Sequence, residues 1–393
     1  MFSPKMLKLG KVRSVIREIF EYGRKRAAEI GAENVFDFSL GNPSIPAPPE
    51  VNLAIKELLE KENSVALHGY TSAPGDPAVR KAVADSIAKR FGVPVTPDYI
   101  YMTAGAAASL CVTLKALTLP GDEVIVFAPF FTEYRVFAES AGAKVKVSMP
   151  GEGLQIDVDN FKSLITPSTK AVIVNSPNNP SGVVYREDII RKVCETLKEK
   201  SEEYGKPIFL ISDEPYRELV YGGVKVPYLM NYYKDTVVCY SYSKSLSLPG
   251  ERIGYIAVNP AATNAADLFA AIAGAGRALG YVCAPSLFQR VVAKCVDKTS
   301  DINAYAKNRD AIYNGLTALG YQCVKPDGAF YLFVKSPIPN AYEFCEKAKE
   351  YELLLVPSDD FGCPGYVRIA YCVSYPQIER SMPAFAKLIE NYK

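Results

Sequence analysis

The sequence is almost free of histidine, because among its 393 residues only His68 carries an imidazole. Zinc centres commonly use several imidazoles, and a Ser-His-Asp triad needs one beside its nucleophile. The single histidine excludes most metal sites of that kind, so we expect no bound metal, and we interpret His68 as structural, which argues against triad hydrolysis. Acid–base chemistry must then fall to lysine, tyrosine, aspartate or glutamate.

The chain also lacks an excess of charge and a long apolar run. Its 45 basic and 43 acidic residues leave a net charge of +2, which gives no overall attraction to nucleic acid or an anionic membrane. No apolar run reaches the ~18 residues of a membrane-spanning helix, and residues 1–10 lack the core of a signal peptide. We therefore expect a cytoplasmic protein with no nucleic-acid or membrane partner.

The cysteines give no sign of a disulfide framework. There are nine, an odd number, and no two stand in a CxxC pair. Scattered thiols of this kind are typical of a reducing compartment and do not indicate a zinc site. Hydrophobic residues make up 49% and charged residues 22%, as in an ordinary globular protein, and the length suggests two or three domains.

Short apolar runs alternate with helical patterns between about residues 98 and 258. The predicted strands are 99–102, 123–127, 144–148, 171–175, 208–212, 236–240 and 253–258. Helical patterns lie between several of them, as at 106–117 and 187–203, and this alternation favours a mostly parallel sheet covered on both faces. Before it, residues 11–31 predict an amphipathic helix and 41–49 an extended Pro-rich passage.

The character of the sequence changes after about residue 320. Strands are predicted at 329–334, 353–356 and 366–371, and helices at 341–351 and 376–390. We therefore expect an α/β fold: a large domain with a mostly parallel sheet sandwiched by helices, and a smaller α+β domain formed by the N-terminal arm and the C-terminal region.

Unusual residues follow four of the predicted strands, where open α/β sheets bind their ligands. Residues 103–107 are small and place free N–H groups at a helix start, which suits a phosphate. The loop 176–182 carries Asn179, whose amide can donate to an oxyanion. Each loop taken alone is also explained by an ordinary turn.

The other two strand ends carry charge. Asp213 ends a buried strand and needs a partner such as a protonated heterocyclic nitrogen, and Tyr216 can approach the same ligand. Lys244 stands eight residues before Arg252, and a desolvated lysine near another cation attacks carbonyls. Ser241 and Arg252 both suit a phosphate. A helix cap and a solvated lysine are the plain alternatives, yet together the four sites describe one ligand, pyridoxal 5′-phosphate (PLP).

With these residues in view, the chain resembles the class I/II aminotransferases, which are PLP enzymes of fold type I. The resemblance runs from about Asp37 to Arg368, and its order and spacing are highly specific although no single motif is. The motifs are Gly41-Asn42-Pro43, Thr103-Ala104-Gly105-Ala106, Asn179-Pro180-Ser181-Gly182, Asp213-Glu214-Pro215-Tyr216, Ser241-Tyr242-Ser243-Lys244, Arg252 and Tyr366-Val367-Arg368.

The resemblance implies catalytic roles for three residues. Lys244 would form an imine with PLP and, once freed, carry the proton between the substrate Cα and the cofactor. Asp213 would pair with the protonated pyridine nitrogen and strengthen the ring as an electron sink. Tyr216 would donate to the cofactor's O3′, together with Asn179. The function implied is transfer of an amino group between an amino acid and a 2-oxo acid in a ping-pong mechanism.

Binding roles are implied for further residues. Phe131 would stack on the pyridine ring, and Gly105, Ala106, Ser241 and Arg252 would hold the phosphate. Arg368 would grip the substrate α-carboxylate, with Gly41 and Asn179 beside it.

The resemblance also implies a homodimer with shared active sites, in which Tyr70 reaches the partner's phosphate. Arg277 would be a residue for substrate specificity, although the sequence around it does not align cleanly. Ala107 departs from the pattern, because one aspartate-type subgroup has a lysine there. The domains expected are residues 1–49 (arm and part of the small domain), 50–285 (PLP-binding) and 286–393 (C-terminal small domain).

Other reactions remain open on the same motifs. A C–S β-lyase or another fold-type-I enzyme would share them, and Arg368 favours a loosened Cα–H bond without separating transamination from β-elimination. The stretch 274–280 looks like a dinucleotide fingerprint but follows a helical pattern instead of a strand. The SxxK at 241–244 lacks the SDN-type and KTG motifs of serine acyl-enzymes.

Overall fold

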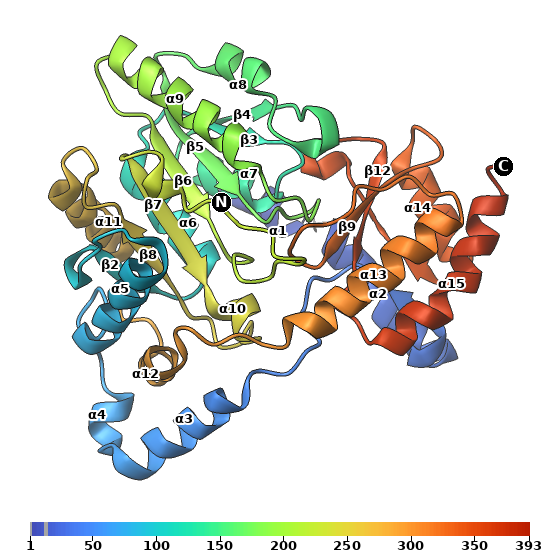
Figure 1. The fold of residues 1–393 in the computed structure, drawn as a ribbon, viewed down its shortest axis with the longest axis horizontal. Helices are drawn as coiled ribbons and strands as arrows, with labels where there is room; N and C mark the ends of the chain where they lie inside the picture. Colours follow the sequence, from blue (N-terminus) through green and yellow to red (C-terminus); the bar gives the residue numbers. More distant parts are fainter. Residues whose placement is uncertain (1, 12–14) are drawn as a thin grey trace.

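The computed structural model of the chain describes residues 2–11 and 15–393, and a sheet of seven strands forms its centre (Figure 1). The strand order is β2-β8-β7-β6-β5-β3-β4, and all neighbours are parallel except the two pairs that include β8. The strands are β2 (Ile100–Thr103), β3 (Glu123–Phe127), β4 (Lys144–Ser148), β5 (Thr169–Asn175), β6 (Phe209–Asp213), β7 (Thr236–Ser241) and β8 (Gly254–Val258). The predicted α/β fold is confirmed.

Helices bury both faces of this sheet, which explains why most of its strands are almost entirely apolar; the edge strand β4 instead alternates lysine and valine. In β2 and β7, Tyr101 and Cys239 lie in one core with α6 and α11, and their neighbours Met102 and Tyr240 lie in another core with α3, α5 and α12. The helices around the sheet are α3 (Pro49–Lys61), α5 (Pro77–Phe91), α6 (Ala106–Leu117), α7 (Glu133–Ser140), α8 (Val158–Leu164), α9 (Glu187–Glu203), α11 (Ala265–Leu279) and α12 (Ser286–Cys295).

A smaller α+β unit stands beside the large sheet, and it combines the two ends of the chain (Figure 1). Its antiparallel sheet has the order β11-β12-β9, and β1 pairs in parallel with β10. The elements are α2 (Val15–Ile30), β1 (Phe36–Asp37), α13 (Ile302–Ala318), β9 (Tyr331–Lys335), α14 (Ala341–Lys349), β10 (Leu353–Leu354), β11 (Val356–Pro357), β12 (Tyr366–Ala370) and α15 (Tyr375–Glu390). The predicted pairing of an N-terminal arm with the C-terminal region is confirmed.

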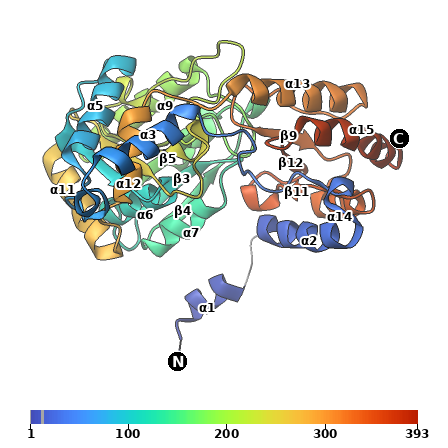
Figure 2. The same cartoon turned by 90° about the horizontal axis from the view of Figure 1, so that it is seen from below.

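Two sequence predictions need correction. The helix expected over 11–31 is observed as α2, while a separate short helix, α1 (Pro4–Lys11), projects from the body and buries no residue (Figure 2); residues 12–14 of that prediction lie outside the described residues. The single strand expected at 353–356 divides into β10 and β11, because the two halves pair in different sheets.

The Pro-rich residues 41–49 connect β1 to α3 and so pass from the small unit to the large one (Figure 1). Pro49 is the first residue of α3, where its missing N–H costs nothing. This passage carries Gly41 across the edge at which β5, β6 and β7 end. None of the helices described is long and apolar enough to span a bilayer.

Candidate active site

A cavity of about 290 Å³ lies where the carboxyl ends of β5, β6 and β7 face the small sheet. Its lining comes from both units and from the passage between them. Ten residues singled out from the sequence line it: Gly41, Ala106, Phe131, Asn179, Asp213, Tyr216, Ser241, Lys244, Arg252 and Arg368. Strands that end at one edge of a parallel sheet bring together residues far apart in sequence, which is why the four loops meet.

Asp213, the last residue of β6, is buried and only half satisfied. Its Oδ2 accepts a hydrogen bond of 2.5 Å from the hydroxyl of Tyr134, and its Oδ1 has no partner. Burial raises the pKa of Asp213 to about 7, although the Tyr134 bond acts in the opposite direction. A buried acceptor without a donor is costly, so Oδ1 calls for an N–H from a ligand.

A second polar residue, Asn175, fixes the end of β5 to the end of β6. Its amide donates to the backbone oxygen of Asp213 at 2.9 Å and its Oδ1 accepts from the backbone N–H of Asn179 at 2.7 Å. The loop that carries Asn179 is therefore fastened directly to the strand that carries Asp213.

Lys244 lies in the short helix α10 (Tyr242–Ser245) directly after β7, with its side chain inside the cavity. Its Nζ donates to the backbone oxygen of Gly41 at 2.7 Å and lies 5.3 Å from the centre of the Phe330 ring. Burial lowers the pKa of Lys244 to about 8, and the positive charges of Arg252 and Arg368 act in the same direction. A larger fraction of this amine is consequently neutral and nucleophilic near neutral pH than for an ordinary lysine.

An anion seat lies at the start of α6. Gly105 precedes this helix without a side-chain cap, so the first N–H groups of the helix stay available. Arg252, in the left-handed region with φ 53°, directs its guanidinium to Ser243 Oγ at 3.3 Å and to the Ala104 oxygen at 3.2 Å. A Cβ at Gly105, where φ is +87°, would lie 2.4 Å from Nη2 of Arg252, so another residue would strain the backbone and displace the guanidinium.

Arg368 forms a second cationic seat from the small sheet. It is 2% exposed, and its guanidinium donates to the Ser39 oxygen at 2.5 Å and to Asn179 Oδ1 at 3.2 Å, while Nε has no partner. The guanidinium carbon lies 4.8 Å from the centre of the Tyr331 ring and 5.3 Å from that of Phe361. This cation is held in place and keeps donor capacity for a carboxylate.

Three residues predicted for the site, Tyr70, Arg277 and Gly105, lie outside the cavity lining of their own chain. Tyr70 follows α4 (Ser64–His68) and is 99% exposed, and Arg277 lies exposed near the end of α11. Gly105 also falls outside the lining, although it shapes the position of Arg252. Ile16 of α2 does line the cavity.

The sequence reasoning missed four polar residues of the site: Tyr134, Asn175, Ser243 and Tyr331. Asn175 could have been found, because a polar residue ends an apolar strand there. Tyr134 lies in a helix and Tyr331 opens a strand of the other unit, and neither carries a signal in its local pattern.

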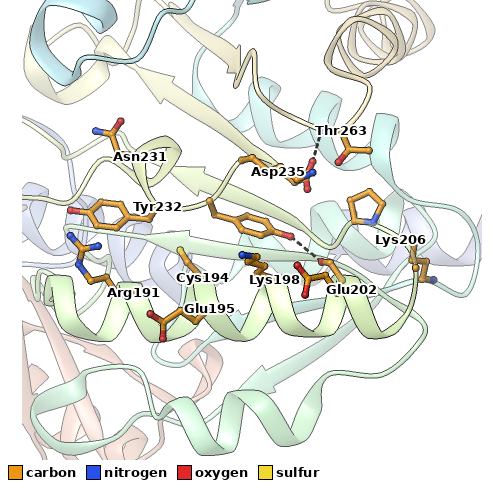
Figure 3. Close-up of a pocket in the computed structure, with 15 residues that line it drawn as sticks. Arg191, Cys194, Glu195, Lys198, Glu202, Lys206, Asn231, Tyr232, Asp235 and Thr263 are labelled. Carbon is orange, nitrogen blue, oxygen red and sulfur yellow. Dashed lines mark hydrogen bonds between the residues drawn. The ribbon is translucent and has the colours of Figure 1, made fainter.

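A larger hollow of about 660 Å³ lies along α9 (Figure 3). It is lined by charged residues of both signs, among them Arg191, Lys198 and Glu202, and Asp235 at its side accepts from the backbone N–H of Thr263 at 2.6 Å. It borders the segments that precede β6 and β7, at the amino ends of these strands. Five residues of strand, ~15 Å, separate it from the edge that carries Asp213.

The fold and the site define the protein class, and comparison with known proteins gives the family. The chain belongs to the aminotransferase class I and II family, which matches residues 33–385. It is 31% identical to an aspartate/prephenate aminotransferase of Thermus thermophilus over 364 residues, 89% of each chain. It is 30% identical to a probable aspartate aminotransferase of Methanocaldococcus jannaschii, over 96% of this chain and 97% of that one.

Solved structures agree with this assignment. A crystal structure of an amino transferase from Eubacterium rectale is 56% identical and superposes with a TM-score of 0.98, covering 100% of this chain and 99% of the other. The aspartate aminotransferase of Thermotoga maritima gives a TM-score of 0.87 at 26% identity, covering 99% and 100%. The protein is an aminotransferase acting on amino acids and 2-oxo acids, in a family that uses PLP. Of the reactions left open by the motifs, transamination is thus the one supported.

Proposed function

We propose that this aminotransferase binds PLP covalently through Lys244 and uses it to move amino groups in two half-reactions. The observation that carries the proposal is the unpartnered Oδ1 of buried Asp213 in the same cavity as the Lys244 amine and the Arg252 seat. These groups match the pyridine nitrogen, the aldehyde and the phosphate of one molecule. When bound, PLP supplies an electron sink for charge that develops at the substrate Cα.

The cofactor contacts follow from this assignment. Ser241, Arg252 and the amides at Gly105 and Ala106 would hold the phosphate, where a helix start adds a favourable dipole. Asp213 would pair with the protonated ring nitrogen, and this pairing would favour its ionised form.

This chain would also contact one face of the cofactor ring, its carbonyl end and its phenolic oxygen. Phe131 lines the cavity and would cover one face, and Lys244 would approach at the carbonyl end. Tyr216 and Asn179 would donate to the phenolic oxygen O3′. Because Asn179 Oδ1 already accepts from Arg368, its amide hydrogens stay free for that purpose.

The substrate would be held by its α-carboxylate on Arg368, beside Gly41 and Asn179. Lys244, once released, would carry the proton between the substrate Cα and the cofactor. Its lowered pKa suits a group that must accept and give up a proton near neutral pH.

The amino donor is constrained by what the cavity contains. Its described cations are Lys244, Arg252 and Arg368, and each already has a role in this assignment. Ile16 and Leu40 add apolar surface, so we propose that an apolar or aromatic donor is used at least as well as aspartate. Arg277 would alter this only if it entered the site from a partner subunit. The relatives matched include aspartate/prephenate and aromatic-amino-acid aminotransferases, which supports testing both classes of donor.

Borohydride trapping tests the proposal. Purified protein supplied with PLP should be yellow, and reduction should fix the cofactor on Lys244, as read by peptide mass spectrometry. A label on another lysine, or a protein that takes up no PLP, would refute it. A panel of amino acids with a 2-oxo acid acceptor then identifies the donor. For Arg277, kcat/KM for aspartate relative to alanine is compared between Arg277→Ala and wild type, and an unchanged ratio would contradict a role in specificity.

A further inference from the structure

A tyrosine of the small unit reaches into the middle of the site. Tyr331 opens β9, is 2% exposed and lines the cavity. Its hydroxyl lies 2.9 Å from the hydroxyl of Tyr216, which belongs to the large unit. This contact joins a residue assigned to the cofactor with a strand of the sheet that carries Arg368.

The chain leaves room for this hydroxyl. A Cβ added at Gly41 would lie 1.9 Å from the Tyr331 hydroxyl oxygen. Gly41 is not among the residues with positive φ, so its backbone does not require glycine. The missing side chain at Gly41 is therefore explained by the approach of Tyr331.

The ring of Tyr331 makes a different contact. The guanidinium carbon of Arg368 lies 4.8 Å from the ring centre, within the range of a cation–π interaction. One side chain therefore contacts the proposed cofactor donor through its oxygen and the proposed carboxylate grip through its face.

The direction of the tyrosine–tyrosine bond follows from counting protons. A phenol has one hydrogen to donate and can still accept. If Tyr216 donates its hydrogen to O3′ of the cofactor, Tyr331 must donate to Tyr216. Burial raises the pKa of Tyr331 to about 12, so the hydrogen needed for this bond is present at working pH.

We propose that Tyr331 is a positioning residue that directs the hydroxyl hydrogen of Tyr216 toward the cofactor and supports Arg368 on its ring. The inference rests on the proposed function, because it takes the cofactor role of Tyr216 from there. Its two contacts are separable by mutation, since Tyr331→Phe removes only the oxygen and Tyr331→Leu removes the oxygen and the ring.

The test uses the PLP-loaded protein and two readouts. The first is the pH midpoint at which the visible absorbance of the bound cofactor changes. The second is KM for the amino donor that the panel identifies. Tyr321→Phe is the matched control, because its hydroxyl donates to the Phe385 oxygen at 2.9 Å in the core of the same small unit.

Tyr331→Phe should raise the midpoint by about half a pH unit, because Tyr216 becomes a weaker donor to the oxygen that carries negative charge. Its KM should stay within about twofold of wild type. Tyr331→Leu should show the same raised midpoint as Tyr331→Phe. It should also raise KM roughly threefold to tenfold, since the ring beneath Arg368 is lost. Tyr321→Phe should match wild type in both readouts.

The inference is overturned if Tyr331→Phe titrates like wild type, or if it raises KM as much as Tyr331→Leu does. A wild-type protein without a visible band would instead refute the proposed function itself. A normal wild-type band with an unmoved Tyr331→Phe midpoint leaves the function in place and removes only the role of Tyr331.

Discussion

At the scale of single residues, the site holds two ionisable groups that burial drives toward their neutral forms. The pKa of Asp213 is raised to about 7 and that of Lys244 is lowered to about 8. Each group therefore costs stability in the charged state until a ligand supplies the opposite charge or forms a bond. The same shifts prepare the site for a cation at the ring nitrogen and for a nucleophilic amine.

The free energy by which buried Asp213 destabilises the folded protein can be measured in the PLP-free protein. Its folded pKa is about 7 against an ordinary 3.8, so between these values the unfolded chain releases a proton that the folded chain keeps. Stability from this group therefore falls as pH rises, by about 3 kcal/mol between pH 5 and 8. Asp213→Asn lacks this titration, so urea unfolding at the two pH values should show the smaller loss for the variant. Equal losses in the two proteins would contradict the assignment.

At the scale of elements, the site depends on how strands end and helices begin. Most strands of the large sheet were predicted within a residue or two, because an apolar run bounded by turn residues is a local signal. α6 and α9 were predicted at their observed bounds, whereas α3, α5 and α13 were missed. Tyr134 lies in α7, which packs against α6 and β4, and its side chain reaches Asp213 at the end of β6, a contact that a local pattern does not reveal.

The junction of β2 and α6 allows a direct test of the anion seat. Gly105→Ala would place a methyl group against the Arg252 guanidinium, and should weaken PLP binding by about tenfold to a hundredfold as charge-assisted bonds to the phosphate are lost. Gly121→Ala is the control, because φ is +97° there and its Cβ would meet nothing within 4 Å. Titrating PLP into the PLP-free proteins, followed by absorbance, measures the PLP affinity of both variants. An equal loss of affinity in the two would indicate backbone strain as the cause instead of the collision with Arg252.

At the scale of the whole molecule, several large apolar side chains near Tyr70 and Tyr281 are exposed. Tyr70 is 99% exposed, Val65 82% and Tyr281 40%. The segment of Tyr70 is tied to that of Tyr281 by the Cys283 N–H, which donates to the Ala73 oxygen. Exposed apolar side chains of this kind favour the homodimer that the resemblance implies.

Mixing two defective variants tests whether Tyr70 serves the partner's site. Tyr70→Ala and Lys244→Ala should each be strongly impaired alone. In a mixed dimer, the site with an intact Lys244 receives Tyr70 from the other subunit, so activity should rise well above the average of the two. No recovery after unfolding and refolding them together, with dimers present by light scattering, would contradict the shared site.

The domain boundaries at 49 and 285 stay predictions.

The sequence by itself determined the fold class and the residues at the strand ends, because both follow from local apolar patterns and from the geometry of parallel sheets. It also indicated the cofactor, since four unusual loops share one edge. Only the tertiary structure decided that Tyr134 donates to buried Asp213, and that Tyr331 contacts Tyr216 and Arg368. The contact of Tyr331 with Tyr216 joins two units that are far apart in the chain, and all of these distances depend on packing that no local pattern encodes.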